Sequence, residues 1–173
     1  MNTMLMEVPF GEAIVKKYPE QTAIVLARDK AGKVNPITLG WIMLTSHVPP
    51  MFAFSVGVTR YSLEVIRYAH EFVIAFPTEL QSRETLLFGT SSGRDLDKLK
   101  MSGIATSPAH KMNSLLLEEA AANFECRLVS EFTTGDHVIF VGEVIASHIN
   151  QNASGRLYTV GKGYKMAGVT IKI

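Results

Sequence analysis

Short apolar segments separated by polar turns dominate the chain and predict a structure built mainly of β-strands. Strand-length apolar segments follow one another at 22–27, 34–46, 51–57 and 71–77. The polar stretch 28–33, which contains Gly32, separates the first two and is typical of a turn. Gly40 lies inside the second segment and can kink a strand, so this segment is either a pair of strands or one bent strand.

Two longer strands are predicted at 122–132 and 137–149, joined by a turn at 133–136. The first alternates, with Phe124, Cys126 and Leu128 on one face and Glu125, Arg127 and Ser130 near the other. The second is apolar on both faces from Val138 to Val141. A strand that is apolar on both faces needs cover on both sides, and a partner subunit can supply the second cover.

Helical periodicity is strongest at 59–70, where Tyr61, Val65 and Tyr68 fall on one stripe and Thr59 is the expected N-cap. A weaker helical pattern covers 79–89. A short helix is predicted at 95–103, with Gly103 closing it. The tail, 150–173, contains a glycine-rich loop and an expected closing strand at 169–173.

Many strands at short spacing with few helices favour a mainly β architecture, a small antiparallel barrel with peripheral helices. An open α+β sheet is the alternative. The length of 173 residues fits one domain spanning 1–173 with a sizeable core.

Composition narrows the classes of function. Hydrophobic residues make up 47% of the chain and charged residues 19%, which is typical of a globular protein. The net charge of +1 gives no basic surface for nucleic acid or an anionic membrane. The N-terminus lacks the pattern of a secretory signal, and the single cysteine, Cys126, forms no internal disulfide. These features together predict a cytoplasmic protein.

Common catalytic motifs are missing from the sequence. The five histidines, at 47, 70, 110, 137 and 148, show no metal-ligand spacing, so a metal site is not expected. The stretch 89–95, GTSSGRD, resembles a glycine-rich phosphate loop but lacks the Lys-Ser/Thr ending, and a plain surface loop is the simpler interpretation.

Two polar segments in the first half of the chain suit a flat, phosphorylated ligand. In 35–41, NPITLGW, irregular backbone leaves donors and acceptors for the edge of a heterocycle, and Trp41 can line an apolar face or belong to the core. In 55–62, Arg60 and Ser62 stand at the start of the expected helix, where free N–H groups favour an anion. A capped helix with an exposed Arg60 is the alternative.

Two further segments lie in the second half. Within 92–98, Lys98 can add a point charge to the same phosphate, or the segment is merely exposed. Within 135–137, His137 starts a strand directly after a turn, where it can face a ligand at the rim of the barrel or serve only the fold.

The ordered set of these segments resembles the flavin reductase-like family of FMN-binding split barrels, and its flavoredoxin branch in particular. The matching pieces are N-P-x-T-x-x-W at 35–41, the double proline and apolar strand at 49–57, R-Y-S-x-E-x-I at 60–66, E-F-V-I at 71–74, G-T-S-S-G-R-D-x-D-K at 89–98, F-E-C-R at 124–127 and G-D-H-x-x-F-V-G-E-V at 135–144. The likeness covers roughly residues 20 to 170.

The resemblance implies a split barrel, a homodimer and non-covalent FMN near the subunit interface. By position, the residues that would surround the cofactor are Asn35, Thr38, Leu39, Gly40, Trp41, Ser55, Arg60, Ser62, Lys98, His137 and Tyr164. Arg60, Ser62 and Ser55 would lie toward the ribityl chain and phosphate. His137 and Lys98 would stabilise charge at the flavin during catalysis. Ser62 stands where family members often have Thr, which keeps the hydroxyl.

Three hypotheses about function follow. In the first, NADH or NADPH binds transiently and reduces FMN, which passes electrons to an acceptor. In the second, the protein is an FMN electron carrier that serves a redox partner protein without nicotinamide turnover. In the third, the same fold binds another planar ligand, such as haem or a pyridoxal compound, or none.

Overall fold

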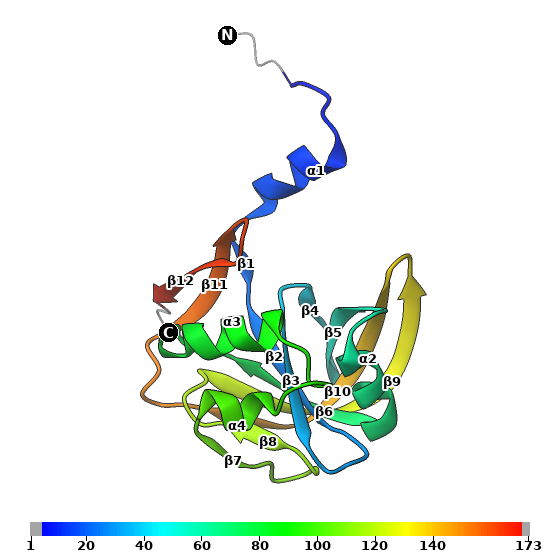
Figure 1. Cartoon of the computed structure of the whole chain (residues 1–173), viewed down its shortest axis with the longest axis vertical. Helices are drawn as coiled ribbons and strands as arrows, with labels where there is room; N and C mark the ends of the chain where they lie inside the picture. Colours follow the sequence, from blue (N-terminus) through cyan, green and yellow to red (C-terminus); the bar gives the residue numbers. More distant parts are fainter. Residues whose placement is uncertain (1–4, 171–173) are drawn as a thin grey trace.

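A seven-stranded antiparallel sheet is the main feature of the computed structural model, which describes residues 5–170 (Figure 1). In hydrogen-bonded order the strands are β3 (Val34–Leu39), β2 (Ala23–Arg28), β6 (Glu71–Phe76), β9 (Ala122–Thr134), β10 (His137–Ile149), β5 (Pro50–Gly57) and β4 (Ile42–His47). The segment 34–46 is therefore a pair of strands, and the two members lie at opposite edges of the sheet.

This strand order requires a curled sheet. Only Gly40 and Trp41 separate β3 from β4, so the two edges must meet. The backbone N–H of Ser55 donates to the Trp41 carbonyl at 2.9 Å, which ties the link to β5 next to the far edge. The predicted mainly β split barrel is confirmed, and the open α+β sheet is excluded.

Smaller elements surround the barrel. A second sheet has the order β1 (Glu20–Gln21), β11 (Gly155–Gly161) and β12 (Lys165–Thr170), and β7 (Thr106–Pro108) pairs with β8 (Leu115–Leu117). The helices are α1 (Phe10–Ala13), η1 (Ile14–Lys17), α2 (Tyr61–Ala69), η2 (Glu79–Gln81), α3 (Ser82–Thr90) and α4 (Lys98–Ser102). The arm formed by α1 and η1 stands away from the barrel (Figure 1). The expected strand 169–173 coincides with β12 as far as Thr170, and its last three residues lie outside the described range.

Two apolar clusters hold the sheet from its two faces. Alternate residues of β2 serve both: Val25 belongs to the cluster inside the barrel, whereas Ile24 and Leu26 belong to the outer one. The inner cluster contains Phe54, Phe72 and Phe140 and is covered by α2. The outer cluster is covered by residues of α3 and β8. No helix among residues 5–170 combines the length and apolar character that crossing a bilayer requires.

The helices differ in detail from the prediction. Thr59 is not the N-cap of α2: Arg60 holds that position with extended backbone, and no side chain caps the helix. The weaker pattern at 79–89 forms a 3-10 turn followed by α3. α4 begins at Lys98 rather than at residue 95, because the Asp97 carboxylate accepts from the Lys100 N–H. Gly103 ends α4 with φ of +67°, as expected for a left-handed C-cap.

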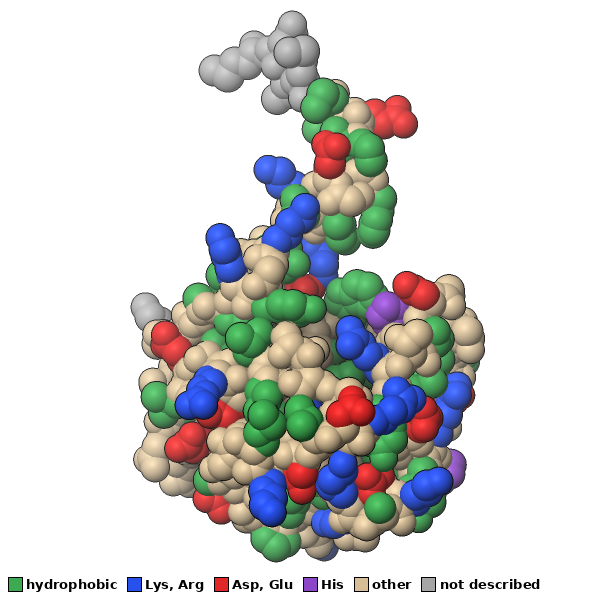
Figure 2. Space-filling view, in the orientation of Figure 1, with side chains coloured by type: hydrophobic (Ala, Val, Ile, Leu, Met, Phe, Trp, Pro, Cys, Tyr) green, Lys and Arg blue, Asp and Glu red, His purple; other side chains and the backbone are tan. Residues whose placement is uncertain are grey.

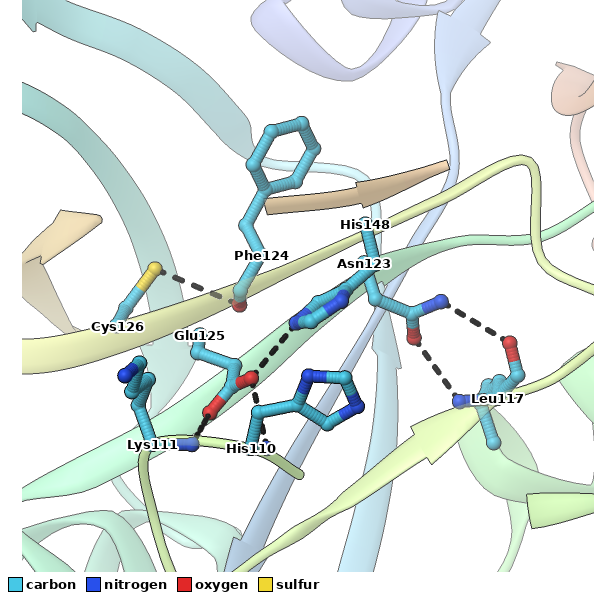
Figure 3. A network of polar contacts seen from close by, with 8 residues as sticks. All are labelled: His110, Lys111, Leu117, Asn123, Phe124, Glu125, Cys126 and His148. Carbon is cyan, nitrogen blue, oxygen red and sulfur yellow. Dashed lines mark hydrogen bonds and ion pairs between the residues drawn. The ribbon is translucent and has the colours of Figure 1, made fainter. Parts of the chain in front are cut away.

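A buried carboxylate fastens the β7–β8 region to the barrel (Figure 3). The Glu125 side chain on β9 is 0% exposed and accepts from the backbone N–H of His110 at 2.9 Å and of Lys111 at 2.7 Å. Nε2 of His148 lies 2.7 Å from the same carboxylate. Burial raises the pKa of Glu125, but the two backbone donors and His148 outweigh it, so the pKa is lower than usual.

Replacing Glu125 by Gln should destabilise the fold by about 1–3 kcal/mol, because an amide nitrogen cannot accept one of these bonds. Since the pKa of Glu125 is lowered on folding, its contribution is present above the usual carboxyl pKa and lost as the pH falls through the folded-state value. Urea denaturation between pH 7 and pH 3 measures both effects. Glu118→Gln, at an exposed glutamate, is the control. Equal stability of the two variants at pH 7 would contradict the assigned role of Glu125.

Candidate functional site

A sizeable cavity opens where the edge strand β3, α3 and the β11–β12 sheet meet. Its volume is about 460 Å³, within the range of roughly 300–1,000 Å³ common for small-molecule sites. It includes five of the predicted site residues, namely Thr38, Leu39, Gly40, Arg60 and Tyr164. Figure 2 shows the molecule hollowed below the N-terminal arm, with basic and histidine side chains at the rim. This space is called the main cavity below.

A second cavity of about 240 Å³ adjoins the main cavity, and Ile37, Arg60 and Gly89 line both. Its other walls are the start of α2 and the loop 89–95, and they include the predicted residues Ser62 and Lys98. Arg60, Arg94 and Lys98 bring three cationic side chains to its surface. It is called the basic cavity below.

Lys98 is the most unusual residue of the basic cavity. Its side chain is 3% exposed, and its ammonium donates to the carbonyls of Phe88 at 3.2 Å and Ser91 at 3.4 Å. Desolvation, followed by the charges of Arg60 and Lys33, lowers the pKa of Lys98 to about 8. Within residues 5–170 no carboxylate pairs with it. The Lys98 ammonium is therefore buried without an anionic partner among the described residues, and an anion in this cavity would stabilise it.

Three more of the predicted site residues lie close together outside the main cavity, namely Trp41, Ser55 and His137. Trp41 is 52% exposed, so it is not a core residue. It shares an apolar hollow of about 250 Å³ with Ser55 and Ile139. The His137 ring lies 4.7 Å from the Trp41 ring, centroid to centroid, and its Nδ1 is 2.7 Å from Asp136 Oδ1. These residues border the main cavity without lining it.

Asn35, another of the predicted site residues, is buried next to the basic cavity. It is 3% exposed, lines neither cavity, and donates from Nδ2 to Ser62 Oγ at 2.8 Å. Its Oδ1 is buried and has no conventional hydrogen-bond partner among the described residues. Asn35 thus supports Ser62 from behind the cavity wall.

Several lining residues were not predicted from the sequence. They are Tyr18, Glu20, Thr85, Leu86, Thr159, Lys162, Gly163 and Met166. Glu20, Thr159 and Met166 belong to the strands of the small β1–β11–β12 sheet, and Lys162 and Gly163 to the turn between β11 and β12. A hydrogen bond between the hydroxyls of Thr22 and Thr159 at 3.0 Å joins this sheet to the residue before β2. The glycines around Lys162 predicted a loop, but no local pattern predicts which cavity a loop will face.

The chain belongs to the flavin reductase-like domain family, whose model matches residues 15–168. An uncharacterised protein of Archaeoglobus fulgidus is 32% identical over 74% of this chain and 71% of its own length. The NADH-dependent FMN reductase AsuE2 of Streptomyces nodosus subsp. asukaensis is 29% identical over 72% of this chain and 66% of its own length.

Solved structures show the same architecture. An FMN-binding protein from Thermus thermophilus, solved with p-hydroxybenzaldehyde, has a TM-score of 0.83 and 26% identity, covering 100% of this chain and 98% of its own. Flavoredoxin from Methanosarcina acetivorans has a TM-score of 0.86 at 22% identity, covering 99% of this chain and 94% of its own, and shows the shared fold.

Proposed function

We propose that the protein binds FMN non-covalently, with the phosphate in the basic cavity and the ring system toward the main cavity. The observation that carries this proposal is that Lys98 is buried beside Arg60 and pairs with no carboxylate among the described residues. Both side chains line the basic cavity, which adjoins the larger main cavity. A phosphate dianion would compensate both cations through charge-assisted hydrogen bonds. The family match and the FMN-binding relative from Thermus thermophilus support the choice of flavin.

In this proposal the chain contributes binding and orientation. Arg60 and the hydroxyl of Ser62 hold the phosphate together with Lys98, and the uncapped N–H groups at the start of α2 add to the positive field. The free edge of β3 at Thr38 and Leu39, with the Gly40–Trp41 link that follows it, offers backbone hydrogen bonds to the polar edge of the ring. Tyr164, in the turn between β11 and β12, bounds the main cavity on another side. Bound FMN would supply hydride and single-electron chemistry.

FMN affinity should fall by about five- to ten-fold between pH 7 and pH 9. The pKa of Lys98 is about 8 without a ligand, and a bound anion would raise it. FMN affinity should therefore be highest below pH 8 and fall at higher pH, where Lys98 of the unliganded protein loses its proton. Titration of flavin fluorescence at constant ionic strength measures this. Lys98→Met should bind more weakly and lose the pH dependence, whereas Lys100→Met, at an exposed lysine of the same helix, should keep it. A pH-independent affinity in the unmodified protein would remove Lys98 from the site.

We also propose that the protein is an oxidoreductase that accepts a hydride from reduced nicotinamide. The Streptomyces relative is an NADH-dependent FMN reductase, which favours this activity over that of a carrier without turnover. The main cavity has an open wall formed by Lys162, Tyr164 and Met166, where a donor can approach. His137, whose ring lies against that of Trp41, would stabilise negative charge on the reduced flavin. Lys98 would do the same from the basic cavity, and neither residue would transfer a proton.

Purified protein loaded with FMN should oxidise NADH or NADPH faster than free FMN at equal concentration, because both reactants are oriented in one cavity. The decrease of nicotinamide absorbance at 340 nm, the usual wavelength for these cofactors, measures the rate. His137→Gln should lower the rate while leaving FMN affinity unchanged. A rate no higher than that of free FMN, with FMN bound, would instead favour the electron carrier.

A homodimer completes the proposal. Ile139 and Val141 on β10 are half-buried, whereas Val138 and Phe140 are in the core. The outward pair continues into exposed Met43 on β4, because Val141 and Met43 are both register partners of Ala53 on β5. Such a contiguous apolar face on a sheet is typical of a subunit interface. A second copy seated on it would also cover the exposed face of Trp41.

Replacing Met43 by Glu should convert the dimer into a monomer, because a carboxylate would be buried in the apolar interface. Sedimentation velocity gives the mass of the particle. Met101→Glu, at another exposed methionine, is the control and should remain dimeric. A monomeric unmodified protein, or a Met43→Glu variant that stays dimeric, would contradict the placement of the interface.

A further inference from the structure

The loop 89–95 forms one wall of the basic cavity, yet it contains little regular structure that would fix its shape. α3 ends at Thr90, and the residues before α4 form turns. A loop whose backbone is to surround a phosphate must be held from outside the cavity, because free loops lose binding energy through ordering. The contacts behind this loop therefore decide how well the cavity is formed.

Two lysines hold the loop by its carbonyl oxygens. Lys98 bonds Ser91, as described above. On the far side, the ammonium of Lys33 donates to the Gly93 carbonyl at 2.7 Å, and more weakly to that of Leu96 at 3.4 Å. Lys33 lines neither the main nor the basic cavity, so its role there differs from that of Lys98.

Lys33 is itself fixed by the turn before β3. One carboxylate oxygen of Asp29 accepts from the Lys33 backbone N–H at 2.9 Å, and the other accepts from the Tyr61 hydroxyl at 3.0 Å. Tyr61 is the first residue of α2 and lines the basic cavity. The same turn therefore positions both the loop and the start of α2.

Gly93 makes the closest approach. A Cβ added there would lie 1.9 Å from Asn35 Oδ1 and 3.1 Å from Tyr61 Cδ1, so only glycine fits. Asn35 has little freedom to retreat, because it is buried and bonded to Ser62 Oγ. The Asn35 oxygen without a conventional partner faces the Cα of Gly93, a contact that a Cα–H group can make.

We infer that Lys33, Asn35 and Gly93 form a clamp that sets the distance between the loop 89–95 and the start of α2. Lys33 and Asn35 line neither cavity and act as positioning residues for a phosphate, whereas Gly93 is the point of the cavity wall that they hold in place. The inference rests on the proposed function and deepens it: the clamp makes the site select a phosphorylated flavin over the same ring without phosphate.

The test compares FMN and riboflavin affinities by fluorescence titration for the unmodified protein, Gly93→Ala and Lys33→Met. Each variant should lower the ratio of FMN to riboflavin affinity by about ten-fold and leave riboflavin binding unchanged, because only phosphate contacts depend on the clamp. Gly93→Ala changes no charge, so its effect cannot be Coulombic. Controls are Lys30→Met, at an exposed lysine of the same turn, and Gly11→Ala, which meets nothing within 4 Å.

Repeating the Lys33→Met titration at high salt separates positioning from long-range charge, since only the latter is screened. The clamp is overturned if Lys33→Met keeps the ratio, if FMN and riboflavin weaken together, or if the loss disappears at high salt. Unfolding of Lys33→Met, with Lys30→Met folded, would overturn it as well, because the contact would then serve the fold. Unmodified protein that takes up neither flavin would overturn the proposed function itself.

Discussion

The two-residue link between β3 and β4 is the constraint on which the architecture depends. Because Gly40 and Trp41 join strands at opposite edges of one sheet, the sheet must curl until those edges meet. The edge strands β3 and β4 are not hydrogen-bonded neighbours in the sheet. The hydrogen bond from the Ser55 N–H to the Trp41 carbonyl fastens the link to β5. Backbone N–H and C=O groups that are not paired within the sheet can therefore bind a ligand at this point, next to the main cavity.

The basic cavity has an energetic cost for the unliganded fold. Lys98 is removed from water, and Arg60 and Lys33 repel it, so its ammonium is less stable there than in solution. The carbonyls of Phe88 and Ser91 offset part of this cost. An anion in the cavity would offset more, and stability would then increase with occupancy. The arrangement contrasts with Glu125, whose negative charge is fully served by donors within the chain.

Local patterns predicted the segments that form the seven strands of the main sheet, because alternation and turn residues depend on neighbours in the chain. They did not predict the order of these strands in the sheet or the strands β1, β7, β8 and β11. They failed where a distant partner decides. Thr59 carries a good capping side chain, but the chain reaches α2 with Arg60 at the cap position instead. No local pattern indicated that Asn35 would be buried against Ser62 and Gly93. Lys33, in an ordinary polar turn, reaches a loop 60 residues away.

The small β1–β11–β12 sheet and the barrel contribute separately to the two cavities. The basic cavity is built from the barrel, α2 and the loop 89–95, whereas Lys162, Tyr164 and Met166 of the added sheet form the open wall of the main cavity. The small sheet is separate from the seven-stranded sheet, and none of its described residues lines the basic cavity. Tyr164, in the turn between β11 and β12, is exposed and has a left-handed backbone conformation with φ of 59°. This conformation is uncommon for residues other than glycine, so the local sequence does not favour it. If FMN binds as proposed, the choice of electron donor and acceptor should depend mainly on this wall, whereas the affinity for the cofactor should depend mainly on the residues of the basic cavity.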